Sequence, residues 1–251
     1  MSGKIPDRWI PYKALGKVID GTRIICFKVP LYKRVQRSSS VTVKDIWDIN
    51  TLLKAIPKLG AVIDLTNTAK YYDPAELKSK GVLYKKILIP GRQLPPEHTV
   101  NVFMDTVDEF LKMNNEWLIG VHCTHGLNRT GYMVCRYMRD RIGIPAKDAI
   151  KSFEMARGYQ IERANLIADL LGKTPPPPDL GTDTVVKPVA NKYEIKRNSS
   201  PTKKIVNGET TSCVSDNKLS WCVPSSKKWK RDRSISKSST SSYEFDYKYD
   251  Y

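Results

Sequence analysis

The sequence predicts an α/β fold, in which a central mixed sheet is flanked by helices and a disordered C-terminal tail follows. Between residues 22 and 171, short segments rich in β-branched residues alternate with segments whose apolar residues recur at helical spacing. After Gly172 a proline run at 175–178 leads into a stretch of Ser, Thr, Lys and Asn, which cannot bury enough apolar surface to fold. We therefore expect a folded domain over residues 1–173 and a disordered, basic, Ser/Lys-rich tail over residues 174–251.

Four strands are expected in the domain. Each is a short run of β-branched and other apolar residues, the composition typical of a buried strand. They cover Thr22–Val29, Ala61–Leu65, Val82–Ile89 and Trp117–Val121.

Five helices are expected between and after these strands. The first is predicted by an apolar stripe between residues 46 and 56, with Thr42 and Asp45 as a capping box at its start. A second stripe lies between residues 100 and 111, and such stripes indicate core packing rather than a binding face. The stripes consist of Ile46, Ile49, Leu53 and Ile56, and of Val100, Phe103, Val107, Phe110 and Leu111. The other three helices are expected at Arg129–Arg141, Ala146–Ala156 and Glu162–Leu171.

The formal net charge of +16 predicts attraction to polyanions, with nucleic acid as the first candidate. Residues 1–173 hold 28 Lys and Arg against 17 Asp and Glu, so most of the excess belongs to the domain. In the tail, the basic cluster at residues 227–233 is typical of a nuclear localisation signal or a nucleic-acid contact, and a solvated charge run is the alternative.

The five cysteines are scattered and include no Cys-x-x-Cys pair, which suggests neither a disulfide framework nor a zinc site. This pattern favours a reducing compartment. The sequence contains no apolar run of about 18 residues, and residues 1–6 lack the apolar run of a secretory signal. We expect a soluble, intracellular monomer that does not associate with a membrane.

The segment His122–Gly131, which reads HCTHGLNRTG, carries the chemistry. It follows a predicted strand, and a predicted helix begins within it at Arg129. A strand, a loop and a helix N-terminus make an anion site, because backbone N–H groups converge at the positive end of the helix dipole. The same field lowers the pKa of a cysteine, so Cys123 is predicted to be an ionised nucleophile that faces a bound phosphate.

Two residues of this signature are expected to assist Cys123. Arg129 is predicted to hold two equatorial phosphate oxygens with its planar guanidinium, most strongly as charge builds up in the transition state. The hydroxyl of Thr130 is predicted to donate to the sulfur and to stabilise it as the leaving group. No metal and no cofactor is implied, because Cys123, Arg129 and the loop amides carry the charge.

The remaining signature residues are expected to shape the loop around the phosphate. His122 and Asn128 are expected to orient the loop, and Gly126 and Gly131 fit the need for tight turns and close approach. The residues predicted to surround the phosphate are Thr124, His125, Gly126, Leu127 and Asn128.

With His before the cysteine and Thr after the arginine, this signature resembles that of protein tyrosine and dual-specificity phosphatases. The resemblance implies the dual-specificity phosphatase fold, a phosphocysteine intermediate and a general acid, an Asp on a loop upstream of the cysteine. In this chain the corresponding stretch, residues 89–96, contains no carboxylate. The nearest carboxylates are Glu97 and Asp105, and a proton supplied by Glu97 is the alternative.

The missing carboxylate favours a di- or triphosphate substrate, because a phosphate-type leaving group departs without an acid. The wider sequence resembles the RNA 5′-triphosphatase branch, meaning the triphosphatase domain of metazoan mRNA capping enzymes and, more closely, the RNA/RNP-complex-interacting (PIR-type) phosphatases. The resembling stretches are residues 5–9, 21–23, 27–31, 64–68, 71–72 and 119–132. The Lys-x-Asp-Gly motif of a guanylyltransferase does not occur, which favours the second group.

This resemblance implies an RNA 5′-triphosphatase and diphosphatase that leaves a 5′-monophosphate. Ribonucleoprotein or splicing-related proteins are implied as further partners, and the nucleus as the location. RNA contacts are expected first from Arg163, at a position that matches the family, and then from Arg92, where the family tends to have His. Lys28 and Arg23, on the first predicted strand, rank third, and a surface charge is the favoured alternative for each.

Two alternatives to this function remain open. The first is a dual-specificity protein phosphatase, for which the tail would be a docking arm. The second is a non-catalytic module that binds phosphate or RNA, which the intact Cys123, Arg129 and Thr130 disfavour.

Overall fold

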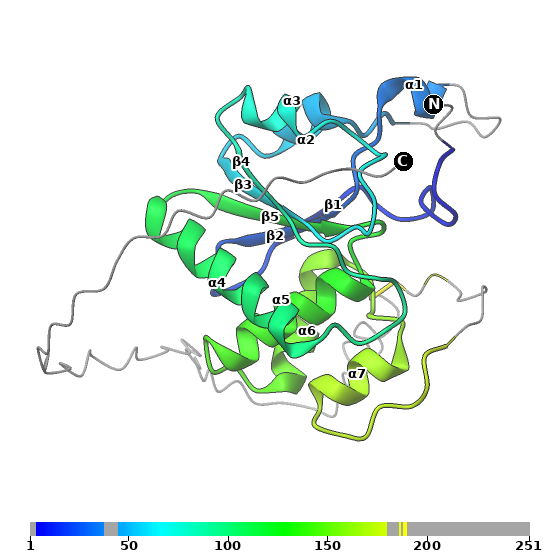
Figure 1. Cartoon of the computed structure of the whole chain (residues 1–251), viewed down its shortest axis with the longest axis vertical. Coiled ribbons are helices and arrows are strands. Elements are labelled where there is room, and N and C mark those ends of the chain that lie inside the picture. The colour runs from blue at the N-terminus through cyan, green and yellow to red at the C-terminus, as the bar shows by residue number, and fades with distance from the viewer. Residues whose placement is uncertain (1–3, 38–44, 180–185, 187, 190–251) are drawn as a thin grey trace, which may run out of the picture. The chain divides into compact units, whose positions relative to one another are not determined.

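The computed structural model describes residues 4–37, 45–179, 186 and 188–189. Its strands are β1 (Leu15–Val18), β2 (Ile24–Lys28), β3 (Leu59–Asp64), β4 (Leu83–Lys86) and β5 (Leu118–Cys123). They form one sheet in the order β1-β2-β5-β3-β4 (Figure 1). β1 pairs antiparallel to β2, and the other three pairs are parallel. The predicted mixed sheet is therefore confirmed.

Helices cover both faces of the sheet. Figure 1 shows α4, α5, α6 and α7 on one side and α2 and α3 on the other. In the described part of the chain, no helix is both long and apolar enough to cross a membrane. The helices are α1 (Lys33–Arg37), α2 (Ile49–Ala55), α3 (Ala75–Lys78), α4 (Glu97–Met113), α5 (Asn128–Asp140), α6 (Ala146–Arg157) and α7 (Ala164–Leu170).

Each face of the sheet has its own apolar core, because successive side chains of a strand point to opposite faces. On β2, Ile24 and Cys26 join the core shared with α4, α5 and α6, whereas Ile25 and Phe27 join the core shared with α2 and α3. Burial on both faces leaves every residue of β2 shielded from solvent. Such a strand needs apolar residues at successive positions, and β2 has them up to Lys28.

The carboxyl ends of the four parallel strands lie at one edge of the sheet. Lys28 at the end of β2 is in register with Cys123 at the end of β5. Asp64 at the end of β3 is in register with both His122 on β5 and Lys86 on β4. Ligand sites of open parallel sheets form outside the carboxyl ends of their strands, so this edge is where a site is expected.

The four predicted strands and five predicted helices are all present, with ends that differ by a few residues. The short elements β1, α1 and α3 were not predicted. The predicted capping box was wrong, because α2 begins at Ile49 and Asp48 caps it by accepting a hydrogen bond from the Thr51 amide at 2.8 Å. Asp45 precedes the helix, and Thr42 lies outside the described residues.

The chain keeps contact with the domain beyond residue 173. Pro188 forms an antiparallel bridge with Tyr159, and the buried Val189 donates its amide to the Gly158 carbonyl at 3.1 Å. Val186 packs against a small apolar cluster that contains Tyr12, Leu127 and Tyr159. The predicted disorder of the rest of the tail and the basic cluster at 227–233 lie outside the described residues, so they stay predictions.

Candidate active site

The signature segment forms a tight loop between β5 and α5. Cys123 ends the central strand β5, Leu127 is the N-cap residue of α5, and the loop between them is closed by a left-handed Gly126 with φ of 68°. A Cβ at Gly126 would lie 2.2 Å from the carbonyl oxygen of Phe27, so the loop backbone packs directly on β2. Only glycine satisfies both the backbone angle and this approach.

Cys123 is 3 % exposed, and its thiol lies at the positive end of α5. Burial alone would raise the pKa of Cys123, but the Arg129 guanidinium, the Thr130 hydroxyl and the loop amides lower it below the ordinary value. The Thr130 hydroxyl is buried and has no oxygen or nitrogen partner in the described residues, so the sulfur is the acceptor available to it. The site therefore favours a thiolate.

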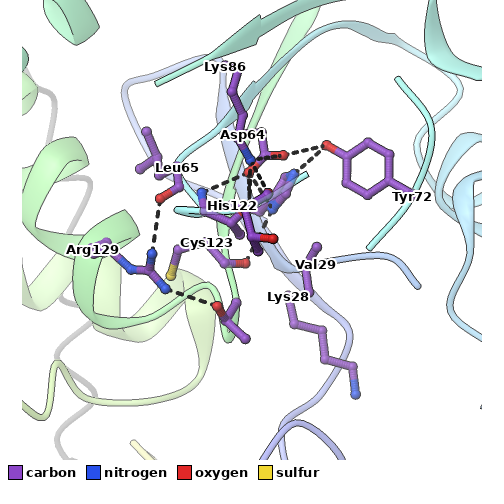
Figure 2. A network of polar contacts seen from close by, with 12 residues as sticks. Lys28, Val29, Asp64, Leu65, Tyr72, Lys86, His122, Cys123 and Arg129 are labelled. Carbon is purple, nitrogen blue, oxygen red and sulfur yellow. Dashed lines mark hydrogen bonds and ion pairs between the residues drawn. The ribbon is translucent and has the colours of Figure 1, made fainter. Parts of the chain in front are cut away.

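The Arg129 side chain lies beside Cys123 (Figure 2), and three acceptors hold it. One terminal nitrogen donates to the carbonyls of Leu65 at 3.2 Å and Ile89 at 2.9 Å, and the other donates to the Thr124 hydroxyl at 2.9 Å. These partners fix the guanidinium plane next to the sulfur. Such a fork matches two oxygens of a phosphate.

Behind the loop, His122 is part of a buried polar network that Figure 2 shows. Its Nε2 lies 2.8 Å from the Tyr72 hydroxyl, and its Nδ1 lies 3.2 Å from the Cys123 carbonyl oxygen. Because a carbonyl only accepts, the network assigns the proton to Nδ1 and leaves Nε2 to accept from Tyr72. Burial lowers the pKa of His122, so the ring is neutral at pH 7.

Asp64 is the charged centre of the same network. It accepts from the Lys86 ammonium at 2.9 Å, the Tyr84 hydroxyl at 3.0 Å and the Thr66 amide at 2.8 Å. Burial would raise the pKa of Asp64, but the Lys86 ammonium and the Thr66 amide lower it below its usual value. Since His122 is neutral, Lys86 is the charge that balances this buried carboxylate.

In front, the N-terminal segment and the turn before α7 clamp the loop. The His125 ring contacts the Asp7 carbonyl at 2.7 Å. Asn128 accepts from the Glu162 amide at 2.8 Å and donates to the Glu162 carboxylate at 3.2 Å. Glu162 in turn binds the Arg8 guanidinium at 2.7 Å. Segments more than 100 residues apart in sequence thus hold the same loop.

A cavity of about 380 Å³ opens over Cys123. Four arginines line it, and Arg8 and Arg92 are the non-glycine residues of the described chain with a left-handed backbone, at φ of 59° and 71°. Such conformations cost energy and cluster at functional sites. The lining residues are Asp7, Arg8, Gly91, Arg92, Cys123, His125, Asn128, Arg129, Arg163 and Leu166.

The structure brings both predicted RNA-binding arginines to this cavity. The Arg92 carbonyl accepts from Asn165 of α7 at 2.8 Å, which fixes the loop where the resemblance expects a general acid. Arg163 is 9 % exposed and pairs with Asp179 at 2.8 Å. Leu127 is placed differently from the other loop residues, because its side chain packs with Tyr12 and Tyr159.

Lys28 and Arg23, the third choice for RNA contacts, are internal anchors, and neither lines the cavity. Lys28 is buried and donates to the carbonyls of Trp9 at 3.1 Å and Tyr12 at 2.8 Å, and Figure 2 shows it directed away from Cys123. Burial and the nearby Arg157 lower the pKa of Lys28 to about 8. Arg23 donates to the last carbonyls of α4 at Leu111 and Asn114.

Neither carboxylate considered as a general acid lines the cavity. Glu97 pairs with Arg136 at 2.5 Å, and Asp105 pairs with Arg141. Asp7 is the carboxylate among the described lining residues, and it was not predicted as a site residue. Arg8 and Asp64 were not predicted either, because no local pattern signals their contacts with a loop more than 50 residues away.

Comparison with known proteins identifies related sequences. Residues 48–174 match the family model described as the dual specificity phosphatase catalytic domain. A putative tyrosine-protein phosphatase 1 of Orgyia pseudotsugata multicapsid polyhedrosis virus is 52% identical over 169 residues, which cover 67% of this chain and 76% of the viral protein. The tyrosine-protein phosphatase of Autographa californica nuclear polyhedrosis virus is 51% identical over 167 residues, 66% of this chain and 98% of that protein.

A human protein named RNA/RNP complex-1-interacting phosphatase is also similar to this chain. It is 44% identical over 172 residues, which cover 66% of this chain. The match spans 51% of the human protein, so this chain corresponds to about half of it.

Replacing the buried carboxylate, Asp64→Asn, is expected to lower the free energy of unfolding at pH 7 by about 3 kcal/mol, because Lys86 loses its counter-charge. The folded-state pKa of Asp64 is depressed, so its contribution is present above the unfolded pKa and is lost as pH falls through the folded pKa. When urea unfolding is measured from pH 7 down to pH 2, the free energy of unfolding of the variant should therefore fall less steeply than that of the unchanged protein. The exposed Asp20→Asn is the control, and an equal, small effect of both variants would contradict the assignment.

Glu97→Gln is expected to change kcat for a phosphotyrosine peptide by no more than about twofold relative to the unchanged protein. Losing a true general acid would instead lower kcat by about 10²- to 10⁴-fold. Its carboxylate is bound by Arg136 away from the cavity. Cys123→Ser provides the inactive reference in the same steady-state assay. A fall of about 100-fold for the peptide would identify Glu97 as the acid after all.

Proposed function

Because the chain belongs to the dual-specificity phosphatase family, we propose that its Cys123 thiolate hydrolyses phosphoanhydride bonds at RNA 5′ ends. The γ-phosphate and then the β-phosphate are removed, and a 5′-monophosphate remains. The observation that carries this proposal is the arginine-lined cavity over Cys123, in which Arg92 occupies the loop where a general acid is expected.

The residues at the site suit each step of this reaction. The thiolate attacks the γ-phosphorus, the bond from phosphorus to the β-bridging oxygen breaks, and the RNA diphosphate leaves with the electron pair. Arg129 holds the equatorial oxygens as charge builds up. Water then attacks the phosphocysteine, inorganic phosphate departs, and Thr130 stabilises the sulfur that is released. A second cycle on the diphosphate end yields the monophosphate.

The leaving group explains why the loop can lack an acid. A departing Tyr oxygen has a conjugate acid with a pKa of about 10 and needs a proton. A diphosphate or monophosphate leaving group is far less basic and is stabilised by positive charge instead. Arg92 and Arg163 line the cavity next to Cys123 and supply such charge.

The charge of the domain and the name of one relative support an RNA end over a free nucleotide. Residues 1–173 carry most of the net positive charge, which attracts the RNA backbone beyond its terminal phosphates. The human relative is named for its interaction with an RNA/RNP complex. A nuclear location and ribonucleoprotein partners belong to the same proposal.

A dual-specificity protein phosphatase is the second candidate, and Asp7 is the observation that favours it. Asp7 lines the cavity, and its carboxylate forms no ion pair within the part of the chain that the structure describes. A carboxylic acid there would supply a proton to a departing Tyr oxygen. The two viral relatives are named tyrosine-protein phosphatases.

The full chain should release phosphate from γ-labelled triphosphate RNA and from diphosphate RNA with kcat/KM at least about tenfold above that for a phosphotyrosine peptide. Cys123→Ser should abolish all three activities. Asp7→Asn should leave both RNA reactions unchanged, because their leaving groups need no proton. Faster turnover of the peptide than of RNA would establish the protein phosphatase, and the absence of any turnover would favour a binding module.

Variants on either side of the Arg163–Asp179 ion pair should change KM for triphosphate RNA in opposite directions. Arg163→Gln removes a charged phosphate contact and is expected to raise KM about tenfold, whereas Asp179→Asn frees the guanidinium and should lower KM. Arg141→Gln, at the far end of α5, is the matched control. Steady-state kinetics at fixed ionic strength measure these effects, and equal KM values in all three variants would exclude Arg163 from RNA binding.

A further inference from the structure

Arg157, the last residue of α6, lies beneath the signature loop and is 1 % exposed. Its Nε donates to the Gly126 carbonyl at 3.2 Å, and one terminal nitrogen donates to the His125 carbonyl at 3.0 Å. The same nitrogen donates to the Lys13 carbonyl at 2.8 Å. One guanidinium therefore joins two consecutive peptide groups of the loop to the N-terminal segment.

These contacts determine where the loop amides point. The C=O and N–H of a trans peptide group point in opposite directions. When Arg157 binds the carbonyls of His125 and Gly126, the amides of Gly126 and Leu127 are directed to the other side of the loop. The Leu127 amide is one of the groups that bond to the Cys123 sulfur and lower the pKa of its thiol. The side of the loop opposite Arg157 thus becomes the anion-binding side.

The charge of Arg157 has no counter-ion in the described chain, and its other terminal nitrogen has no hydrogen-bond partner there. The Tyr159 ring centroid lies 5.3 Å from its guanidinium carbon. A buried charge without a partner is costly, and an apolar residue that filled the same space would avoid that cost. The charge itself is therefore expected to have a use.

That use is suggested by the groups that surround Cys123. Burial raises the pKa of Cys26 on β2 to about 12, and burial also raises the pKa of Tyr71. His122 on β5 is neutral, and the Asp64 carboxylate behind it is balanced by Lys86. From the cavity, Arg129 on α5 faces the thiolate together with Arg8, Arg92 and Arg163. From behind the loop, the Arg157 guanidinium on α6 interacts electrostatically with Cys123.

We propose that Arg157 is a positioning residue that directs the amides of the signature loop toward the phosphate and keeps a positive charge behind the Cys123 thiolate. It touches no substrate. Arg129 binds the phosphate from the open side of the loop, and Arg157 supports the same phosphate and the sulfur from the closed side through the loop peptides. The alternative is a purely structural role, in which Arg157 only links α6, the loop and the N-terminal segment.

The test measures the Cys123 thiolate directly in the full chain and does not use RNA. The rate of Cys123 alkylation by iodoacetamide is followed from pH 4 to pH 9 by mass spectrometry, with and without inorganic phosphate as a protecting anion. Arg157→Met removes the charge and the fork, and Arg157→Lys keeps only the charge. Arg136→Met is the matched control, because Arg136 is a buried arginine of α5 that binds Glu97 and Asp140 rather than the loop.

Arg157→Met is expected to raise the apparent thiol pKa by about one unit and to weaken phosphate protection about tenfold. Arg157→Lys should keep the thiol pKa near that of the unchanged protein and still lose phosphate protection several-fold, since an ammonium cannot bind three carbonyls in the same plane. Arg136→Met should alter neither value, although it lowers the melting temperature.

If Arg157→Met keeps the thiol pKa and the phosphate protection of the unchanged protein and lowers only the melting temperature, Arg157 has a purely structural role. If Arg157→Met does not fold, Arg157→Lys decides, and unchanged phosphate protection in that variant would overturn the proposal. Because neither readout involves RNA, a failure here is distinct from a failure of the proposed RNA activity.

Discussion

A negative charge on a buried sulfur is the constraint on which the rest of this structure depends. Cys123 is almost fully enclosed, and enclosure by itself favours the neutral thiol. The thiolate forms only where fixed dipoles and cations offset the lost hydration. The end of the central strand, the first turn of α5 and the Arg129 guanidinium provide them within one short loop. Positions at a strand edge or on a surface helix would lack this convergence.

The loop keeps its shape because separate parts of the chain hold it from different directions. β2 supports it from behind, so closely that Gly126 has no room for a side chain. The hydrogen bond from Tyr72 to His122 fixes the strand that delivers Cys123. The link from Arg8 through Glu162 to Asn128 closes the front. Stability and chemistry are therefore coupled, since the loop that these supports hold carries the Leu127 amide, which bonds to the sulfur.

The sequence predicts the parts of this site that are local in the chain. The strand, loop and helix around Cys123 follow from an apolar run and a ten-residue motif, and neighbouring residues are enough to place Arg129 and Thr130 beside the thiol. The roles of Asp7, Arg8 and Arg157 could not be predicted, because no local pattern shows that their segments fold against the signature loop. Lys28 was expected to be exposed, because a lysine at a strand end suggests a surface charge. It is instead buried, and its ammonium binds two backbone carbonyls.

The packing of Val186, Pro188 and Val189 has a practical consequence for how an isolated catalytic unit is produced. The proline run invites truncation at residue 173, but the segment beyond it covers Tyr159 and the apolar cluster that includes Leu127. Leu127 belongs to the signature loop itself, so cutting at the proline run would uncover the rear of the active site. A protein that ends after Val189 retains this cover.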